Sequence, residues 1–298
     1  MSNSNTYISG IGGIVGEMHN NSIENCHVLS GTIYYFSTAE TEAVSGIIIG
    51  GVIGTGNSII NCTSNGDIFI NGHGIICGGV AGSSQNLERC INYGNIDVIT
   101  SGSVNCGGVV GAAHGNAVDH CVNFGDLSES VTIDDEGNKH NVGGIAGDIS
   151  DTPVKNCINY GSIDQEINRL STMTLIESAG GIVGVGGDLY GDRTKISNCY
   201  NLARSISSKT NNMDGSSRYS VAKRILGRHE SASESILWGG CKLENVYSID
   251  TQLNGKSAND ELMASGIQNA CNGETLTKEE MNEKIQYILE ALGLDQTA

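Results

Sequence analysis

A short glycine phrase that recurs along most of the chain limits its fold more than any other feature. The phrase reads Gly-Gly-aliphatic-x-Gly, and a second phrase that contains a cysteine follows each full copy. Six full copies begin at Gly12, Gly50, Gly78, Gly107, Gly143 and Gly180, and a degenerate seventh begins at Lys223. Repeats of this length are typical of solenoids, in which each unit buries its apolar side only against its neighbours.

The tightest repeat units are 28 residues long, from Gly50 to Gly78, and 29 residues long, from Gly78 to Gly107. This length accommodates three short strands and three turns. Paired helices are excluded in practice, because each interior glycine costs a helix about 1 kcal/mol and the units are rich in β-branched residues. We predict an all-β fold, a parallel β-helix of about seven coils, right-handed like most parallel crossovers.

The composition requires a thin, layered core. The 298 residues include 42 glycines and one proline, and only 5% are aromatic, so the interior must come mainly from Ile, Val, Leu, Ala and Cys. We expect two inward rows, one aliphatic and one of cysteines. The rows are Ile14, Val52, Val80, Val109, Ile145 and Ile182, and Cys26, Cys62, Cys90, Cys121, Cys157 and Cys199.

The end of the chain has a helical period. Thr277-Lys278-Glu279-Glu280 is a capping-box pattern, and apolar residues from Met281 to Leu292 then fall on one helical face before Gly293. One amphipathic helix is predicted, and we expect it to cover the open end of the last coil. The expected division is a solenoid over 1–271 and a helical cap over 272–298. No similar cap is evident at the N-terminus, which suggests a piece of a longer chain.

Charge and hydropathy exclude two kinds of partner. The chain has 16 basic and 33 acidic residues, a net charge of −17, and cannot supply the positive stripe that nucleic acid binding requires. It has no run of about 18 apolar residues, so membrane insertion is not expected. The first residues contain no recognisable signal peptide.

The ten cysteines are expected to be free thiols buried as small apolar side chains. The two closest in sequence are Cys77 and Cys90, so the chain has no Cys-x-x-Cys pair of the kind that binds structural zinc. Stacked cysteines also have parallel side-chain directions, which disfavours disulfides. We predict no metal and no cofactor.

An asparagine precedes most of these cysteines. Because asparagine tolerates left-handed backbone and can bond to stacked neighbours, a ladder of asparagines at a turn is expected. Its members are Asn25, Asn61, Asn156, Asn198 and Asn245. Arg89 and His120 interrupt the ladder, and we expect His120 to be outward and solvated.

No catalytic motif is found, and no catalytic residue is predicted. Gly-x-Ser-x-Gly is absent, and Gly255-Lys256-Ser257 lacks the glycine that a phosphate-binding loop needs at Asp250. Acidic residues cluster in two expected loops, as Asp134, Asp135 and Glu136, and as Asp188 and Asp192. Solvated turn residues are the favoured interpretation, with a Ca²⁺ site or a catalytic group as alternatives, although the calcium-loop pattern is not met.

The run Ile33-Tyr34-Tyr35-Phe36 is the densest aromatic segment. Two of its four side chains should face inward, because a strand alternates its faces. Core packing is therefore the favoured interpretation, and an exposed platform for a sugar ring is the alternative.

The phrases Gly12–Gly16 and Gly180–Gly184, followed by Ile23–Cys26 and Ile196–Cys199, resemble the GLUG motif repeats of bacterial surface and secreted proteins. These repeats also occur beside the metallopeptidase domain of IgA-cleaving enzymes, but this chain has no His-Glu-x-x-His. The resemblance covers about residues 10–250. Isoleucine or valine stands where the family phrase has leucine.

The resemblance implies an extracellular or cell-surface module that works without catalysis, although a cytoplasmic location stays open. We expect it to bind a glycan or a protein through a solenoid face or a corner loop. Two alternatives are a polysaccharide-degrading β-helix enzyme and an accessory region that positions substrate for a secreted peptidase. Carboxylates on successive coils of one face would favour the enzyme, and the repeated positions hold Gly, Asn, Ile and Cys instead.

Overall fold

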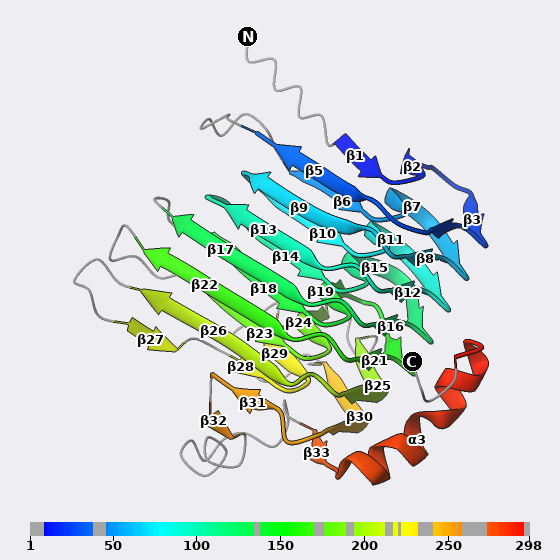
Figure 1. Ribbon diagram of the computed structural model, residues 1–298, viewed down its shortest axis with the longest axis vertical. Coiled ribbons are helices and arrows are strands. Elements are labelled where there is room, and N and C mark those ends of the chain that lie inside the picture. The colour runs from blue at the N-terminus through cyan, green and yellow to red at the C-terminus, as the bar shows by residue number, and fades with distance from the viewer. Residues whose placement is uncertain are drawn as a thin grey trace.

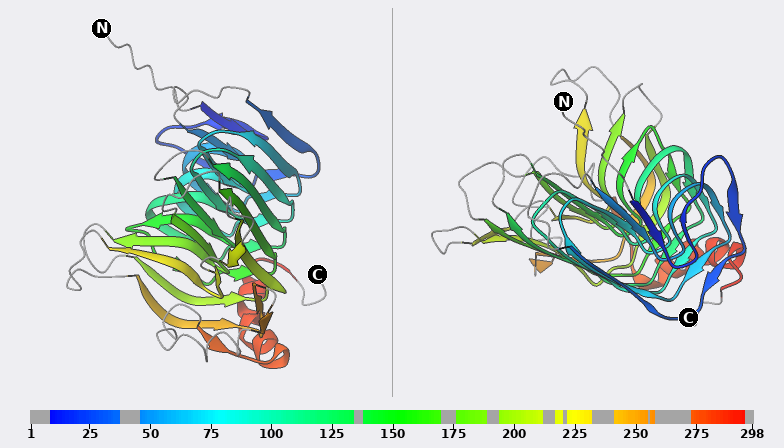
Figure 2. Two further views of the ribbon diagram at one scale, coloured as in Figure 1. Left: turned by 90° about the vertical axis from the view of Figure 1, so that its left-hand side faces the viewer. Right: turned by 90° about the horizontal axis from the view of Figure 1, so that it is seen from above.

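The computed structural model describes residues 9–37, 46–133, 138–169, 176–188, 194–211, 217–219, 222–231, 241–254, 256–257 and 273–294. In these ranges the chain forms three sheets of stacked, mostly parallel strands (Figure 1). Seen from above, the strands of each coil curl around a common interior (Figure 2). Within the described residues, the predicted parallel β-solenoid with one C-terminal helix is confirmed. No described helix has the length and apolar character needed to cross a membrane.

Sheet A contains one strand from each of seven coils, and its strands lie just before the glycine phrase. Its strands are β1 (Ser9–Gly12), β6 (Ile47–Gly50), β10 (Ile75–Gly78), β14 (Val104–Gly107), β18 (Lys139–Gly143), β23 (Ile176–Gly180) and β28 (Ala222–Lys223). The first glycines of the repeats pair from coil to coil. A Cβ atom at Gly78 would lie 2.1 Å from the Ala81 carbonyl oxygen, so only glycine fits at this turn.

Sheet B follows the glycine turn and has 17 strands, because each coil crosses it in two or three segments. The segments after the turn are β2 (Val15–Glu17), β7 (Ile53–Ile60), β11 (Ala81–Glu88), β15 (Val110–Asp119), β19 (Ala146–Ser150), β24 (Val183–Asp188) and β29 (Leu226–Ser231). Those around the cysteines are β3 (Ser22–Glu24), β4 (His27–Val28), β8 (Thr63–Ser64), β12 (Ile91–Asn92), β16 (Val122–Asn123), β20 (Val154–Lys155), β21 (Ile158–Asn159), β25 (Lys195–Asn201), β30 (Lys242–Ser248) and β33 (Glu274–Thr275).

Sheet C completes each coil and has nine strands, of which β27 and β32 are antiparallel to their neighbours. The strands are β5 (Thr32–Phe36), β9 (Asp67–Gly72), β13 (Ile96–Thr100), β17 (Leu127–Ile133), β22 (Ile163–Arg169), β26 (Ser205–Asn211), β27 (Ser217–Tyr219), β31 (Gln252–Leu253) and β32 (Lys256–Ser257).

The predicted inward rows are confirmed in the stacked coils. Val52, Val80, Val109, Ile145 and Ile182 are fully buried, as are the row cysteines from Cys62 to Cys199. All nine described cysteines are free. Ile14 is 47% exposed because it belongs to the first coil, which has a neighbouring coil on one side only.

Helix α3 (Lys278–Ala291) has the predicted capping box at Thr277, but its position differs from the expectation. Its buried residues Met281, Ile285, Ile288 and Leu289 pack on the outer side of sheet B, and not over the interior of the last coil. The partners are apolar residues that follow the ladder cysteines, namely Ile91, Val122, Ile158 and Tyr200. Because these residues face outward, they form an apolar stripe along the coils, and α3 packs on this stripe. Figure 1 shows the helix beside the strands of sheet B.

The interior between sheets A and C changes character along the solenoid. In the apolar interior region, Ile70 and Val98 of sheet C and Ile75 and Val104 of sheet A are buried. The rows then continue as Glu129, Gln165 and Ser208 in sheet C and as His140 in sheet A. We call these four buried residues the polar interior region. The repeated sequence patterns do not predict this polar region.

Side chains of the polar interior region bond to one another. His140 Nδ1 lies 2.9 Å from Glu129 Oε1, and Gln165 Nε2 donates to Glu129 Oε2 at 2.7 Å. Ser208 Oγ donates to Gln165 Oε1 at 2.5 Å. One imidazole atom, His140 Nε2, is buried without a hydrogen-bond partner among the described residues.

Candidate binding surface

The acidic clusters found in the sequence are largely outside the described residues. This applies to Asp134, Asp135, Glu136 and Asp192, whereas Asp188 ends β24. The favoured interpretation of these acids as solvated turn residues therefore stays a prediction, with the calcium and catalytic roles as its alternatives. In the described ranges, no three His, Cys, Asp or Glu side chains are grouped so that they could hold a metal ion.

The aromatic run lies in β5, the first strand of sheet C, and it divides between the two faces. Ile33 and Tyr35 pack against the core, which confirms that two of the four side chains point inward. Tyr34 and Phe36 point outward and are 67% and 61% exposed. The segment therefore serves both the core and the surface, because strand alternation gives it one apolar row on each face.

Phe69 of β9 joins the two exposed rings to form an aromatic patch of three side chains. Its ring centroid lies 6.0 Å from that of Tyr34 and 5.6 Å from that of Phe36, and the Tyr34 and Phe36 rings stack at 6.4 Å. The in-register pairing of Tyr34 with Phe69 brings the rings together. With so few aromatic residues in the whole chain, three on one exposed face form a concentrated apolar surface.

The outer face of sheet C becomes polar beyond the aromatic patch. In register with Phe69, successive strands place Asp97, Ser128 and Asp164. Ser128 separates the two carboxylates, so this row lacks the acids on successive coils that would favour a polysaccharide-degrading enzyme. The aromatic patch thus lies at one end of a long, mostly polar surface.

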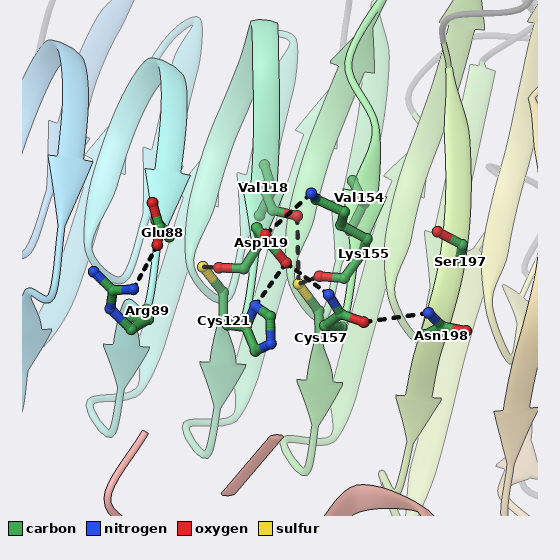
Figure 3. Close-up of polar contacts among 12 residues, drawn as sticks. Glu88, Arg89, Val118, Asp119, Cys121, Val154, Lys155, Cys157, Ser197 and Asn198 are labelled. Atoms are coloured by element: carbon green, nitrogen blue, oxygen red, sulfur yellow. Dashed lines mark hydrogen bonds and ion pairs between the residues drawn. The ribbon is translucent and has the colours of Figure 1, made fainter. Parts of the chain in front are cut away.

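The ridge where sheet B bends contains the predicted asparagine ladder, which is confirmed. Its five asparagines have φ between 50° and 54°, and Arg89 and His120 keep this left-handed backbone with φ of 52° and 51°. Side chains bond from coil to coil, for example Asn198 Nδ2 to Asn156 Oδ1 at 3.3 Å (Figure 3). Asparagine is favoured here because it tolerates this backbone and supplies both donor and acceptor.

Asp119 replaces the missing asparagine oxygen where His120 interrupts the ladder. Its carboxylate lies 2.8 Å from His120 Nδ1 and 3.1 Å from Lys155 Nζ, and accepts from Asn156 Nδ2 at 2.9 Å (Figure 3). We expected a solvated His120. Its imidazole instead faces the Asp119 carboxylate, and its side chain is only 26% exposed. The Tyr287 hydroxyl of α3 also donates to Asn156 Oδ1 at 3.2 Å. These polar groups hold coils and helix together.

The buried thiols of the cysteine row are poorly reactive. Burial raises the pKa of the Cys62 thiol to about 12 and raises the pKa values of Cys90, Cys121 and Cys157 well above the ordinary value. The Cys157 Sγ donates to the Lys155 carbonyl at 3.1 Å, and the other row thiols make similar bonds. Because the thiolate is both the nucleophile and the metal ligand, these residues serve the core.

A second asparagine ladder is completely buried and was missed in the sequence. Asn123 Nδ2 donates to Asn159 Oδ1 at 2.9 Å and to the Gly125 carbonyl at 2.8 Å. The same pattern extends to Asn92 and Asn201. The signal was available, because Asn-aromatic-Gly follows the cysteine by two residues in three copies, at Asn92, Asn123 and Asn159.

Comparisons of the chain with protein-family models, with curated proteins and with solved structures find no match. The resemblance to the GLUG repeats therefore rests on the sequence motifs quoted above. The surface features are then the remaining basis for an inference about function.

Proposed function

We propose that this chain is a non-enzymatic binding module of a bacterial surface or secreted protein, and that it presents the outer face of sheet C to a glycan. The aromatic patch is the observation that carries the proposal. Two of its rings are more than half exposed, although burial would stabilise them. Exposed apolar patches rimmed by polar groups mark interaction sites.

The composition of the face favours a saccharide partner. Sugar rings pack their C–H surfaces on aromatic side chains and bond their hydroxyls to polar neighbours. Asn71 and Asp97 are next to the patch in the strand register and would supply such bonds. A protein partner is the alternative that the same experiment can reveal.

The solenoid suits presentation because it is a stiff rod. Seven coils at about 4.8 Å per coil extend about 34 Å along the axis. Strands β5 and β9, which contain the aromatic patch, lie at the N-terminal end of this rod, and α3 lies towards the other end (Figure 1). A module of this shape would hold its binding face at a fixed distance from whatever carries it.

Binding of the purified chain to arrays of glycans and extracellular-matrix proteins, with and without Ca²⁺, tests the proposal. The double variant Tyr34→Thr/Phe36→Thr removes the two exposed rings but keeps β propensity. Ile99→Thr is the matched control, since Ile99 is 39% exposed on the same face outside the patch. We expect the double variant to lose at least about tenfold in affinity, as for a hot spot worth more than about 1.4 kcal/mol.

Equal binding by the double variant and the wild-type chain would contradict the proposed face. Binding to matrix proteins alone would replace the glycan by a protein partner. An array without any binding would favour a spacer role.

A further inference from the structure

A cleft of about 740 Å³ lies between the start of α3 and the edge of sheets B and C. Its volume falls within the range of about 300 to 1,000 Å³ that is usual for ligand sites. Its apolar wall consists of Tyr160, Leu202 and Ile249, which are partly buried against the helix. The Tyr160 ring ends a stack that continues through Phe124 to Tyr93, with centroid spacings of 4.8 and 4.9 Å.

Two cations, Arg204 and Lys278, line this cleft. Arg204 lies just before β26, and Lys278 is the first residue of α3. Among the described residues, neither side chain has a hydrogen bond or an ion pair. Elsewhere in the described ranges, Arg89 pairs with Glu88 and Lys155 pairs with Asp119. Both residues are exposed, so their charged groups are accessible to a ligand.

The other polar groups of the cleft are already engaged in part. Asp126 Oδ1 accepts from the Ser162 N–H at 2.7 Å. Burial lowers the pKa of Arg224, and the charge of Asp250 partly offsets this, so Asp250 acts on a cation of its own. At the start of α3, the Glu280 N–H is also engaged, because it donates to Thr277 Oγ1 at 3.2 Å. Asp126 and Asp250 thus contribute two carboxylates to the cleft beside its two cations, and Arg204 and Lys278 are the groups in it that can attract an anion.

We infer that the cleft binds an acidic saccharide through the carboxylate of a hexuronic acid residue. Arg204 and Lys278 would bind the carboxylate, since a guanidinium matches its two oxygens and charge-assisted hydrogen bonds are the strong ones. The sugar ring would pack on Leu202 and Tyr160, and Gln252 of the rim would bond to hydroxyls. This site is separate from the aromatic patch, so either can exist without the other.

Calorimetric titration of the full chain with a tetrasaccharide of galacturonic acid tests the inference, with a neutral galactose tetrasaccharide as the matched ligand. The variants are Arg204→Ala and Lys278→Ala, and the control is Lys209→Ala, which removes a cation of β26 outside the cleft. All three positions lie outside the core, so circular dichroism should show an unchanged fold.

We expect the acidic tetrasaccharide to bind at least about tenfold more tightly than the neutral one, by the strength of a charge-assisted bond. Arg204→Ala should weaken binding about tenfold or more, and Lys278→Ala by a smaller factor, while Lys209→Ala should change it less than about twofold. Added salt should reduce the preference for the acidic ligand.

Three results would overturn the inference: no binding of the acidic tetrasaccharide, equal binding of the neutral one, or equal affinity for the wild-type chain and both cleft variants. The aromatic patch variant Tyr34→Thr/Phe36→Thr separates the two sites. If it still binds the acidic ligand while Arg204→Ala does not, the cleft is the site, whatever the array shows for the patch.

Discussion

The apolar and polar interior regions occupy equivalent positions of the same solenoid and differ only in side chains. Ile70, Val98 and Glu129 are in register on successive strands of sheet C, and all three are buried. Val104 and His140 are likewise paired in sheet A. Register therefore determines which positions are buried, whereas the polarity of the buried side chain varies independently of register.

In-register stacking allows polar side chains to be buried, because it supplies their hydrogen-bond partners. Each polar side chain finds the equivalent position one coil away, as Glu129, Gln165 and Ser208 do through bonds of 2.7 and 2.5 Å. The apolar region instead gains from burial alone, at about 25 cal/mol per Å² of apolar surface. The two regions should therefore respond differently to pH and to mutation.

The largest expected effect is alkaline destabilisation through the buried thiols of the cysteine row. Burial raises the folded-state pKa values of Cys62, Cys90, Cys121 and Cys157, so their stabilising contribution is full below about pH 8.5 and is lost as the pH rises. Each thiol costs about 1.4 kcal/mol per pH unit there, or roughly 5 kcal/mol for four between pH 9.5 and 10.5. Urea unfolding at these pH values measures the slope.

The variant Cys121→Val/Cys157→Val is the control for the thiol effect, because Val246 occupies the same row beside Cys199. It should reduce the slope by about 3 kcal/mol per pH unit. An unchanged slope would show that other groups cause the alkaline loss.

Next in size is the loss of the buried carboxylate in the polar region. Glu129→Ala leaves the His140 imidazole without its carboxylate and Gln165 Nε2 with only the His140 carbonyl oxygen at 3.4 Å, and it should cost about 3 to 5 kcal/mol in the free energy of unfolding. Glu129→Val/His140→Val should recover most of this loss, because valine holds both positions one coil earlier, at Val98 and Val104. Urea unfolding at pH 7 compares the variants, and a double variant no better than the single one would mean that the pair is not the cause.

The sequence predicted what repeats. The glycine, cysteine and outer asparagine rows recur in most copies. Their alternation and spacing therefore predicted the β-helical coil and the side chains that form its core. The polar region does not repeat along the chain. Strand alternation nevertheless predicts that Glu129 points inward, because it follows the inward Leu127 by two residues, as Ile70 follows Ile68. That Glu129 meets His140 depends on how two sheets face each other, which spacing along one strand does not contain.

Two further features were less accessible to sequence reasoning. The position of α3 depends on which apolar surface of the solenoid is left uncovered. That surface is formed by the outward residues directly after the cysteines, such as Ile91 and Val122, and the repeat pattern alone does not identify it as the docking site. The cleft combines Arg204 with Lys278, which are 74 positions apart and become neighbours only through the docking of the helix.

A smaller effect on stability is expected for the buried asparagine ladder, whose side chains bond to one another from coil to coil. Asn159→Ala removes bonds to Gly161 and Asn201 and leaves buried partners unsatisfied, at a cost of about 2 kcal/mol. Asn198→Gly in the outer ladder keeps the left-handed backbone and should cost about 1 kcal/mol or less. Equal losses measured by urea unfolding would mean that burial adds nothing to the ladder.

The smallest effect is expected when one aliphatic side chain of the apolar interior region is replaced by another. Ile70→Val removes one buried methylene group and should cost about 1 kcal/mol, since Val98 shows that valine fits the equivalent position one coil further. Thermal unfolding at pH 7 gives the value beside that of Glu129→Ala at the same register. A loss as large as that of Glu129→Ala would show that both interior regions depend on close packing, and that the polar bonds are not the source of the difference.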